Sequence, residues 1–210
     1  MRINVFKTTV VAGLGLLAGQ HGDAQGTFLN LNFESPILPL TSPVPGLVPA
    51  TNALPGWTVY LSGNPTDFVF YPEVPIGSPS IALVNSQTQF YPSIQGNYSV
   101  FFRGAGLGQT GQIPNNVAAL LFLRDPSAFF LASFGGQNIP LVQFGTSGNN
   151  IIMAGNISMF AGQTGELLFS GGGLFDAIQF SSTPIPEPGK ISLFVVGALF
   201  LGWRRTVRSP

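Results

Sequence analysis

Eleven short runs of strand-forming residues recur along residues 25–183, and clusters of Gly, Pro, Asn and Ser separate them. In Phe28–Phe33 and Phe175–Phe180, apolar and polar residues alternate, as in a strand with one buried face. Val117–Leu123 is compatible with helix or strand, and its length and setting favour strand. The pattern predicts an all-β fold, an antiparallel β-sandwich of the jelly-roll kind. The expected strands are Phe28–Phe33, Trp57–Leu61, Asp67–Tyr71, Ser80–Val84, Tyr98–Arg103, Val117–Leu123, Phe129–Phe134, Pro140–Phe144, Asn156–Phe160, Glu166–Phe169 and Phe175–Phe180.

Between these runs, the proline-rich segment Pro36–Pro55 has little periodicity and is expected to form a long loop over the sandwich. Residues 181–188 are rich in Ser, Thr and Pro, which is typical of an extended linker.

One glycine pattern, Gly106-x-Gly108-x-x-Gly111, matches the dinucleotide-binding fingerprint letter by letter. That fingerprint needs a helix directly after its glycines, and here Pro114 and Asn115 follow instead. We therefore interpret it as a glycine-rich turn that binds no pyrophosphate.

The N-terminus has the three parts of an export signal. Arg2 and Lys7 form a positive region, Thr8–Ala18 is apolar, and Gly22-Asp23-Ala24 supplies small residues for cleavage after Ala24. Residues 1–24 are therefore predicted to be a signal peptide that directs the chain to the Sec machinery.

The C-terminus carries a second apolar segment, the 13 uncharged residues Ile191–Trp203. As a helix they would extend about 20 Å, which is short for a permanent membrane span. Arg204, Arg205 and Arg208 follow, and the positive-inside rule puts them in the cytoplasm and the preceding body outside. Residues 189–210 are thus expected to be a single hydrophobic anchor helix with a basic tail; an ordinary single-pass anchor is the alternative.

Pro186-Glu187-Pro188, followed by the apolar segment and the terminal arginines, resembles the PEP-CTERM sorting signal. The resemblance covers about 25 C-terminal residues. It implies that an exosortase recognises and removes the tail. It further implies that the protein is held briefly at the inner membrane with its body in the periplasm, and then reaches the outer surface or the extracellular matrix. The organisation expected is a signal peptide (1–24), a β-sandwich domain (25–180), a linker with the PEP motif (181–188) and the sorting anchor (189–210).

Charge is unevenly distributed along the chain. Residues 25–183 hold two basic residues, Arg103 and Arg124, against six acidic ones, which gives the body a net charge of about −4. Without a basic patch, nucleic-acid binding is not expected. The polar residues are mainly Asn, Gln, Ser, Thr and Gly, a composition that suits contact with a sugar or a matrix.

The chain has no cysteine, and its one histidine, His21, lies in the predicted signal peptide. The mature body would therefore lack Ser-His-Asp and Cys-His catalytic systems and the usual zinc ligands. A carboxylate-dependent glycosidase is the enzymatic alternative, but no motif presents a pair of acids. The sequence favours a protein that is not an enzyme.

Two Tyr-Pro sequences, Phe70-Tyr71-Pro72 and Phe90-Tyr91-Pro92, lie 20 residues apart. Tyrosine offers an apolar ring face and a hydroxyl, so Tyr71, Tyr91 and the nearby Tyr60 are candidates for stacking on sugars. Packing in the core is the alternative for each.

Phe33-Glu34 near the first strand and Asp176 in the last resemble the ends of carbohydrate-binding and galactose-binding-like jelly rolls. In such families two acids in these places help to hold a structural calcium ion, so Glu34 and Asp176 are candidate calcium ligands by this resemblance. Two solvated carboxylates are the alternative.

The sequence thus predicts an exported, non-enzymatic cell-surface or extracellular-matrix protein, associated with the exopolysaccharide of a biofilm. A carbohydrate-binding module is one alternative. A self-assembling structural surface protein is another, suggested by uncharged, strand-rich segments.

Overall fold

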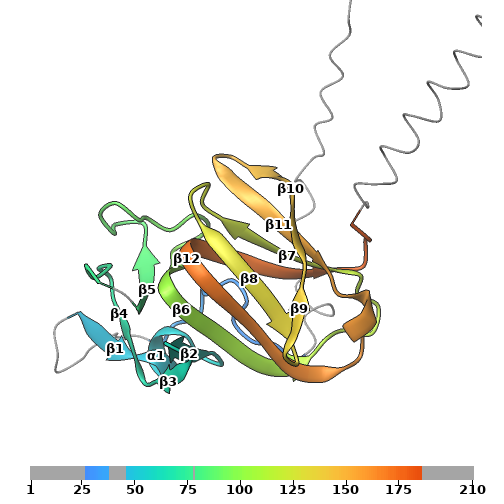
Figure 1. Cartoon of the computed structure of the whole chain (residues 1–210). Helices are drawn as coiled ribbons and strands as arrows, with labels where there is room; N and C mark the ends of the chain where they lie inside the picture. The colour runs from blue at the N-terminus through green and yellow to red at the C-terminus, as the bar shows by residue number, and fades with distance from the viewer. Residues whose placement is uncertain (1–26, 38–45, 78, 186–210) are drawn as a thin grey trace, which may run out of the picture.

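The computed structural model describes residues 27–37, 46–77 and 79–185 (Figure 1). These residues form an all-β protein, as predicted, with twelve strands and two short helices. The predicted signal peptide, the Pro186-Glu187-Pro188 motif and the C-terminal anchor with Arg204, Arg205 and Arg208 lie outside the described residues. Within the described ranges, no helix is long and apolar enough to cross a membrane.

The strands follow one another along the chain, and the longest connection, between β5 and β6, covers residues 86–97. They are β1 (Leu47–Pro49), β2 (Thr58–Leu61), β3 (Asn64–Thr66), β4 (Phe68–Phe70), β5 (Ser80–Asn85), β6 (Tyr98–Gln112), β7 (Ala119–Arg124), β8 (Phe129–Phe134), β9 (Gln137–Ile139), β10 (Leu141–Ser147), β11 (Asn150–Asn156) and β12 (Thr164–Ser181). The helices are α1 (Ala50–Ala53) and the 3-10 helix η1 (Ser158–Phe160).

Two long strands, β6 and β12, pair along most of their length and belong to two layers at once. Layer one has the order β1-β4-β5-β6-β12-β7-β11-β10 and uses the first part of β6 and the last part of β12. Layer two has the order β3-β2-β6-β12-β8-β9 and uses the other part of each long strand. The sheet is therefore folded over on itself in a sandwich-like arrangement, which Figure 1 shows as the long curve of β6 and β12. The pairing is antiparallel as predicted, except that β4 and β5 run parallel.

Glycines make the change of layer in β12 possible. The β6–β12 register shifts between Gly171 and Gly172, and Gly171 and Gly173 have φ angles of 153° and 108°. A Cβ at Gly171 would overlap the carbonyl oxygen of Phe129, and one at Gly173 would overlap the Ala128 side chain. Both the φ angles and the lack of room for a Cβ thus require glycine at these two positions, where β12 passes from one layer to the other.

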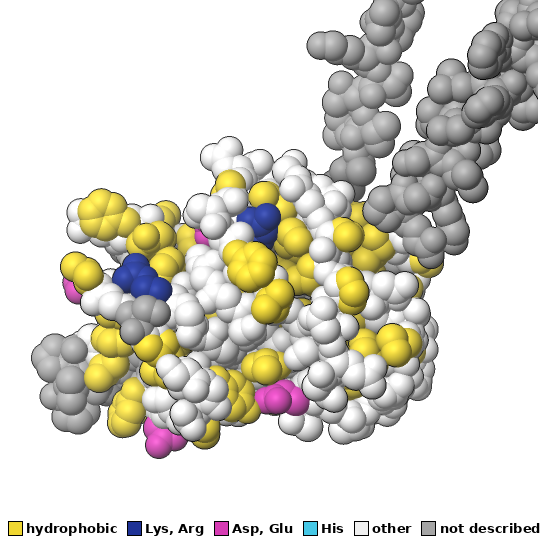
Figure 2. Space-filling view, viewed as in Figure 1, with side chains coloured by type: hydrophobic (Ala, Val, Ile, Leu, Met, Phe, Trp, Pro, Cys, Tyr) yellow, Lys and Arg dark blue, Asp and Glu magenta, His cyan; other side chains and the backbone are white. Residues whose placement is uncertain are grey.

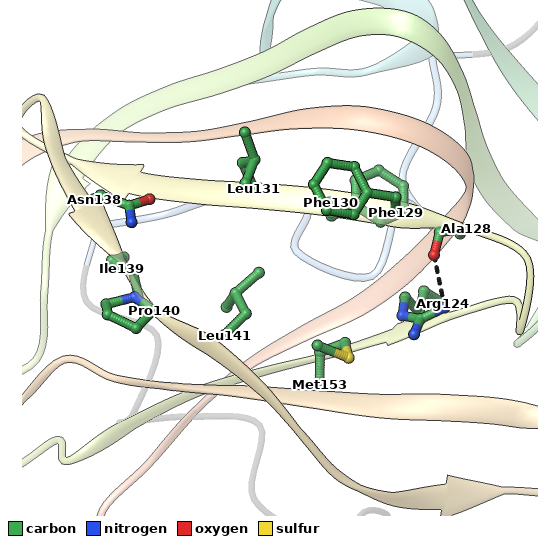
Figure 3. A pocket seen from close by; sticks show the side chains of 10 residues that line it. All are labelled: Arg124, Ala128, Phe129, Phe130, Leu131, Asn138, Ile139, Pro140, Leu141 and Met153. Atoms are coloured by element: carbon green, nitrogen blue, oxygen red, sulfur yellow. Dashed lines mark hydrogen bonds between the residues drawn. The ribbon is translucent and has the colours of Figure 1, made fainter.

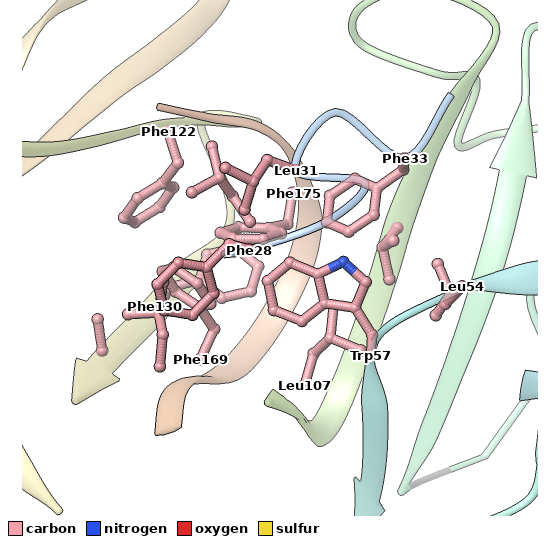
Figure 4. Packing of buried hydrophobic residues seen from close by; sticks show 14 of the residues in the cluster. Phe28, Leu31, Phe33, Leu54, Trp57, Leu107, Phe122, Phe130, Phe169 and Phe175 are labelled. Carbon is pink, nitrogen blue, oxygen red and sulfur yellow. The ribbon is translucent and has the colours of Figure 1, made fainter. Parts of the chain in front are cut away.

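The core between the layers is built mainly from phenylalanine rings (Figure 4). Phe175 lies 4.6 Å from Phe169 and 5.0 Å from both Phe122 and Phe130, measured between ring centroids. These three pairs are tilted, and Phe122 meets Phe169 edge to face, an arrangement that aromatic pairs prefer. Since Phe175 and Phe122 come from layer one and Phe130 and Phe169 from layer two, this cluster holds the layers together.

The predicted strand Phe28–Phe33 is wrong. Phe28, Leu31 and Phe33 are buried, but the segment is a turn, with positive φ at Asn30 and Phe33. The Trp57 indole nitrogen donates to the Asn30 carbonyl, and the Gln109 side chain bonds the Leu29 backbone N–H and C=O. Side chains therefore satisfy backbone groups that a neighbouring strand would otherwise pair. Phe28, Leu31 and Phe33 of this segment pack among the other core residues (Figure 4).

Two other predicted strands need correction. In Asn156–Phe160, β11 ends at Asn156, whose side-chain oxygen accepts hydrogen bonds from the N–H and the hydroxyl of Ser158 and so starts η1. Glu166–Phe169 and Phe175–Phe180 are not separate strands but parts of β12, because Gly171–Gly173 carry the strand through its change of layer. The ambiguous Val117–Leu123 region forms β7, a strand.

The glycine-rich turn predicted at Gly106, Gly108 and Gly111 is also wrong, because all three lie inside β6. Large side chains cover them: a Cβ at Gly111 would come 2.9 Å from the Phe28 ring. Pro36–Pro55 is not a loop throughout, since β1 and α1 lie within its described part.

Candidate functional site

Tyr60 lies on the outer face of layer two, away from the core. In the ladder it is opposite Gly106, while its neighbour Val59 points into the core. A Cβ at Gly106 would be 3.4 Å from Tyr60 Cβ, and one at Gly108 would be 3.1 Å from Tyr60 Cε2. The Tyr60 side chain therefore lies along β6 over two glycines, and the close approach at Gly108 explains why a glycine occupies that position of the strand.

The Tyr60 hydroxyl reaches across to the next strand and donates a hydrogen bond of 2.7 Å to Glu166 Oε1. This bond, together with burial of the ring, raises the pKa of the Tyr60 hydroxyl. The pair is half-buried and joins β2 to β12. It presents an aromatic ring beside a carboxylate that accepts further hydrogen bonds.

Residues around this pair form a single outward row across four strands. Tyr60 is opposite Gly106, Gly106 is opposite Ser170, and Ser170 is opposite Leu131. Three steps between neighbouring strands make the row about 14 Å long. We call this surface the Tyr60 face; the adjoining row adds Thr58, Leu168 and Ser133.

Small and hydroxylated side chains beside an aromatic ring are the features that hold a sugar: apolar ring faces stack and hydroxyls bond to Ser, Thr and carboxylate oxygens. Tyr60 was predicted from sequence as a candidate. Glu166 was not, because a pairing over 106 residues has no local signal.

The other two candidate tyrosines lie elsewhere and do not share a surface. Tyr71 packs on the main core, 6.5 Å from the Tyr98 ring, and its hydroxyl accepts a hydrogen bond from Asn85 Nδ2. Tyr91 packs 4.4 Å from Phe101, in a smaller apolar cluster on the opposite side of the β5–β6 pair. The structure thus brings neither to Tyr60, and each contributes to packing.

Glu34 and Asp176 do come near one another, at the loop that precedes β6. Glu34 Oε1 accepts hydrogen bonds from the backbone N–H groups of Asn97 and Tyr98, at 2.8 and 2.9 Å, and Oε2 accepts one from Asn97 Nδ2. Asp176 is buried and accepts from Ser99 Oγ and the Ala177 N–H. Burial raises the pKa of Asp176 to about 7, against these hydrogen bonds, and the nearby Glu34 adds to the rise.

These groups fit a calcium ion poorly. Calcium prefers six to eight oxygen ligands, whereas N–H and O–H donors are directed at both carboxylates here. Among the described residues there is no cluster of three or more acids, histidines or cysteines. The two acids instead fasten the loop at residues 95–99 to the body.

A hollow of about 210 Å³ lies where the layers diverge, between β8 and the β7–β11 pair (Figure 3). Phe129, Leu131, Leu141 and Met153 contribute apolar lining, and Arg124 and Asn138 are the polar side chains that line it. Figure 2 shows hydrophobic side chains gathered around a basic one over β7 and β8.

Arg124 has a structural task at this hollow. Its Nη1 donates to the carbonyl oxygens of Asp125, Pro126 and Ala128, which holds the β7–β8 connection. The hollow therefore has apolar walls and a guanidinium that is already engaged, and it offers less for a sugar than the Tyr60 face.

No model of a known protein family, no curated protein and no solved structure matches this chain.

Proposed function

We propose that this chain is an exported, non-enzymatic surface or matrix protein that contacts extracellular polysaccharide through the Tyr60 face. The observation that carries the proposal is the hydrogen-bonded Tyr60–Glu166 pair on an outward-facing surface where three hydroxylated residues, Thr58, Ser133 and Ser170, lie beside two leucines. The negative body and its lack of histidine and cysteine support contact rather than catalysis.

Export and sorting complete the proposal. The Sec machinery would translocate the body, and an exosortase would remove the tail at the Pro186-Glu187-Pro188 region after brief anchoring in the inner membrane. The protein would then remain at the outer surface or in the matrix. We also propose that the folded sheet is a sandwich of the jelly-roll kind.

Retention of the secreted protein on the polysaccharide of its own matrix tests the contact. Tyr60→Ala should reduce retention at least tenfold, because it removes the ring and leaves Glu166 without its partner. Met159→Ala, at an exposed position in η1, is the matched control and should leave retention unchanged. Equal retention of both variants would contradict the proposal.

Mass spectrometry of the mature protein, with and without an active exosortase, tests the sorting. We expect the terminal arginines to be lost only when the exosortase is active. An intact C-terminus in both samples would refute this part.

A further inference from the structure

The folded sheet ends in edge strands of two different kinds. In the part of the chain that the structure describes, the edges are β1, β3, β9 and β10. The first three have three residues each, and proline lies in β1 (Pro49), in β3 (Pro65) or directly after β9 (Pro140). Short length and proline are devices that prevent an edge from pairing with another chain.

The fourth edge, β10, is more than twice as long and has no proline within it; Pro140 directly precedes it, and one register shift interrupts its ladder before its last residues, Gly145–Ser147. It has seven residues, Leu141–Ser147, without proline and without a charged side chain. It pairs with β11 on one side, and Figure 1 shows it as the outermost strand of layer one. A register shift between Gln143 and Gly145 leaves Phe144 half-exposed beside this edge.

The end of β10 presents backbone groups to solvent. Gly148 (φ 58°) and Asn149 form a two-residue turn that joins Ser147 to its ladder partner Asn150. In such hairpins the closing pair is hydrogen-bonded, and hydrogen bonding then alternates along the strand. The N–H and C=O of Thr146 therefore point away from β11, towards a strand that would lie beside β10.

We propose that a second copy of this chain pairs its β10 antiparallel with this β10 about a two-fold axis, which extends layer one across a dimer. An antiparallel pair of identical strands is self-complementary, so a single surface serves both copies. The absence of charge on β10 means that no like charges meet across the axis. With Thr146 on the axis, each copy donates and accepts one hydrogen bond at this residue.

Disulfide trapping in the full chain tests the pairing, because the chain has no cysteine of its own. Thr146→Cys would place two thiols on the axis, at a Cα separation of about 5.5 Å, which a disulfide accepts. Under a mild oxidant such as copper–phenanthroline, we expect a covalent dimer to form at least tenfold faster than with Thr164→Cys, an exposed control at the start of β12. Equal rates for the two variants would overturn the proposal.

A second measurement does not depend on a thiol. Thr146→Pro removes the N–H that points away from β11, and sedimentation velocity should show a dimer for the natural chain and a monomer for this variant. An unchanged melting temperature would show that the fold survives. A natural chain that stays monomeric at the highest concentration, or a Thr146→Pro dimer, would count against the pairing and leave the Tyr60 face untouched.

Discussion

Ser99 Oγ donates a hydrogen bond of 2.5 Å to Asp176 Oδ2, and both side chains are buried where the start of β6 meets the end of β12. Ser99 Oγ also accepts the N–H of Ile94, so the carboxyl anchors the loop before β6 through one hydroxyl. A buried acid in this position makes the stability of the fold depend on pH.

The first prediction concerns that dependence. Burial raises the pKa of Asp176 from 3.8 to about 7. A raised folded-state pKa means that the folded protein holds the proton more tightly than the unfolded chain does. This contribution to stability is full below pH 4 and is lost as pH rises through 7, by up to roughly 1.4 kcal/mol per pH unit.

Asp176→Asn resembles the protonated acid but has no group that titrates, so it should remove the pH dependence that Asp176 gives to the free energy of unfolding. We expect the free energy of unfolding of the natural protein to fall relative to that of Asp176→Asn between pH 4 and pH 7. Urea unfolding of both proteins at a series of pH values measures the difference. A difference that stays constant over this range would disprove the prediction.

The second prediction uses the glycines below Tyr60. A Cβ at Gly108 would lie 2.5 Å from Glu166 Oε1 and 3.1 Å from Tyr60 Cε2, so Gly108→Ala should push the pair apart. At Gly145, which lies in β10 outside the Tyr60 face, the nearest atom would be 3.7 Å away, which is ordinary contact, and Gly145→Ala serves as the control. Polysaccharide retention should fall several-fold for Gly108→Ala and little for Gly145→Ala. The opposite order would show that the Tyr60 face is not the contact surface.

These glycines also show where sequence reasoning stops. Short runs of strand-forming residues, several with alternating apolar and polar positions, identified the β class and most strand positions. A half-buried strand has this alternation within its own residues, so it can be recognised locally. Gly106 and Gly108 suggested a turn, because the side chains that leave no room for a Cβ at Gly108, those of Tyr60 and Glu166, come from more than 40 residues away in the chain. Phe28–Phe33 shows the converse: its apolar spacing suits a strand, but side chains of Trp57 and Gln109 bond the backbone of Leu29 and Asn30, and only the Leu31 carbonyl accepts a backbone N–H from β12, that of Ile178.

Candidate sites were subject to the same limit. Sequence placed Glu34 and Asp176 near each other by resemblance, and the structure does bring them to one loop. The sequence did not indicate that Tyr60 pairs with Glu166. It also could not show that Tyr71 and Tyr91 pack on opposite sides of the β5–β6 pair. Contacts between strands that are far apart in the chain produce no local pattern in the sequence.

The third prediction concerns the core. Phe175 is fully buried and packs against five other rings, namely Phe33, Phe102, Phe122, Phe130 and Phe169. Phe175→Ala should lower the free energy of unfolding by about 3–5 kcal/mol. Phe129→Ala, at a side chain that is 65% exposed, should change it by about 0.5 kcal/mol or less. Chemical denaturation measures both, and similar losses for the two would contradict the packing described.

The fourth prediction concerns calcium at Glu34 and Asp176. Because N–H and O–H donors already meet both carboxylates, we expect millimolar calcium and excess EDTA to leave the melting temperature unchanged. Glu34→Gln should nevertheless destabilise the protein by about 1–3 kcal/mol, since it weakens hydrogen bonds to the loop at Asn97 and Tyr98. A rise in melting temperature with calcium that Glu34→Gln abolishes would establish the metal site after all. Destabilisation by Glu34→Gln without any calcium effect would show that the carboxylate acts as a fastening for the loop.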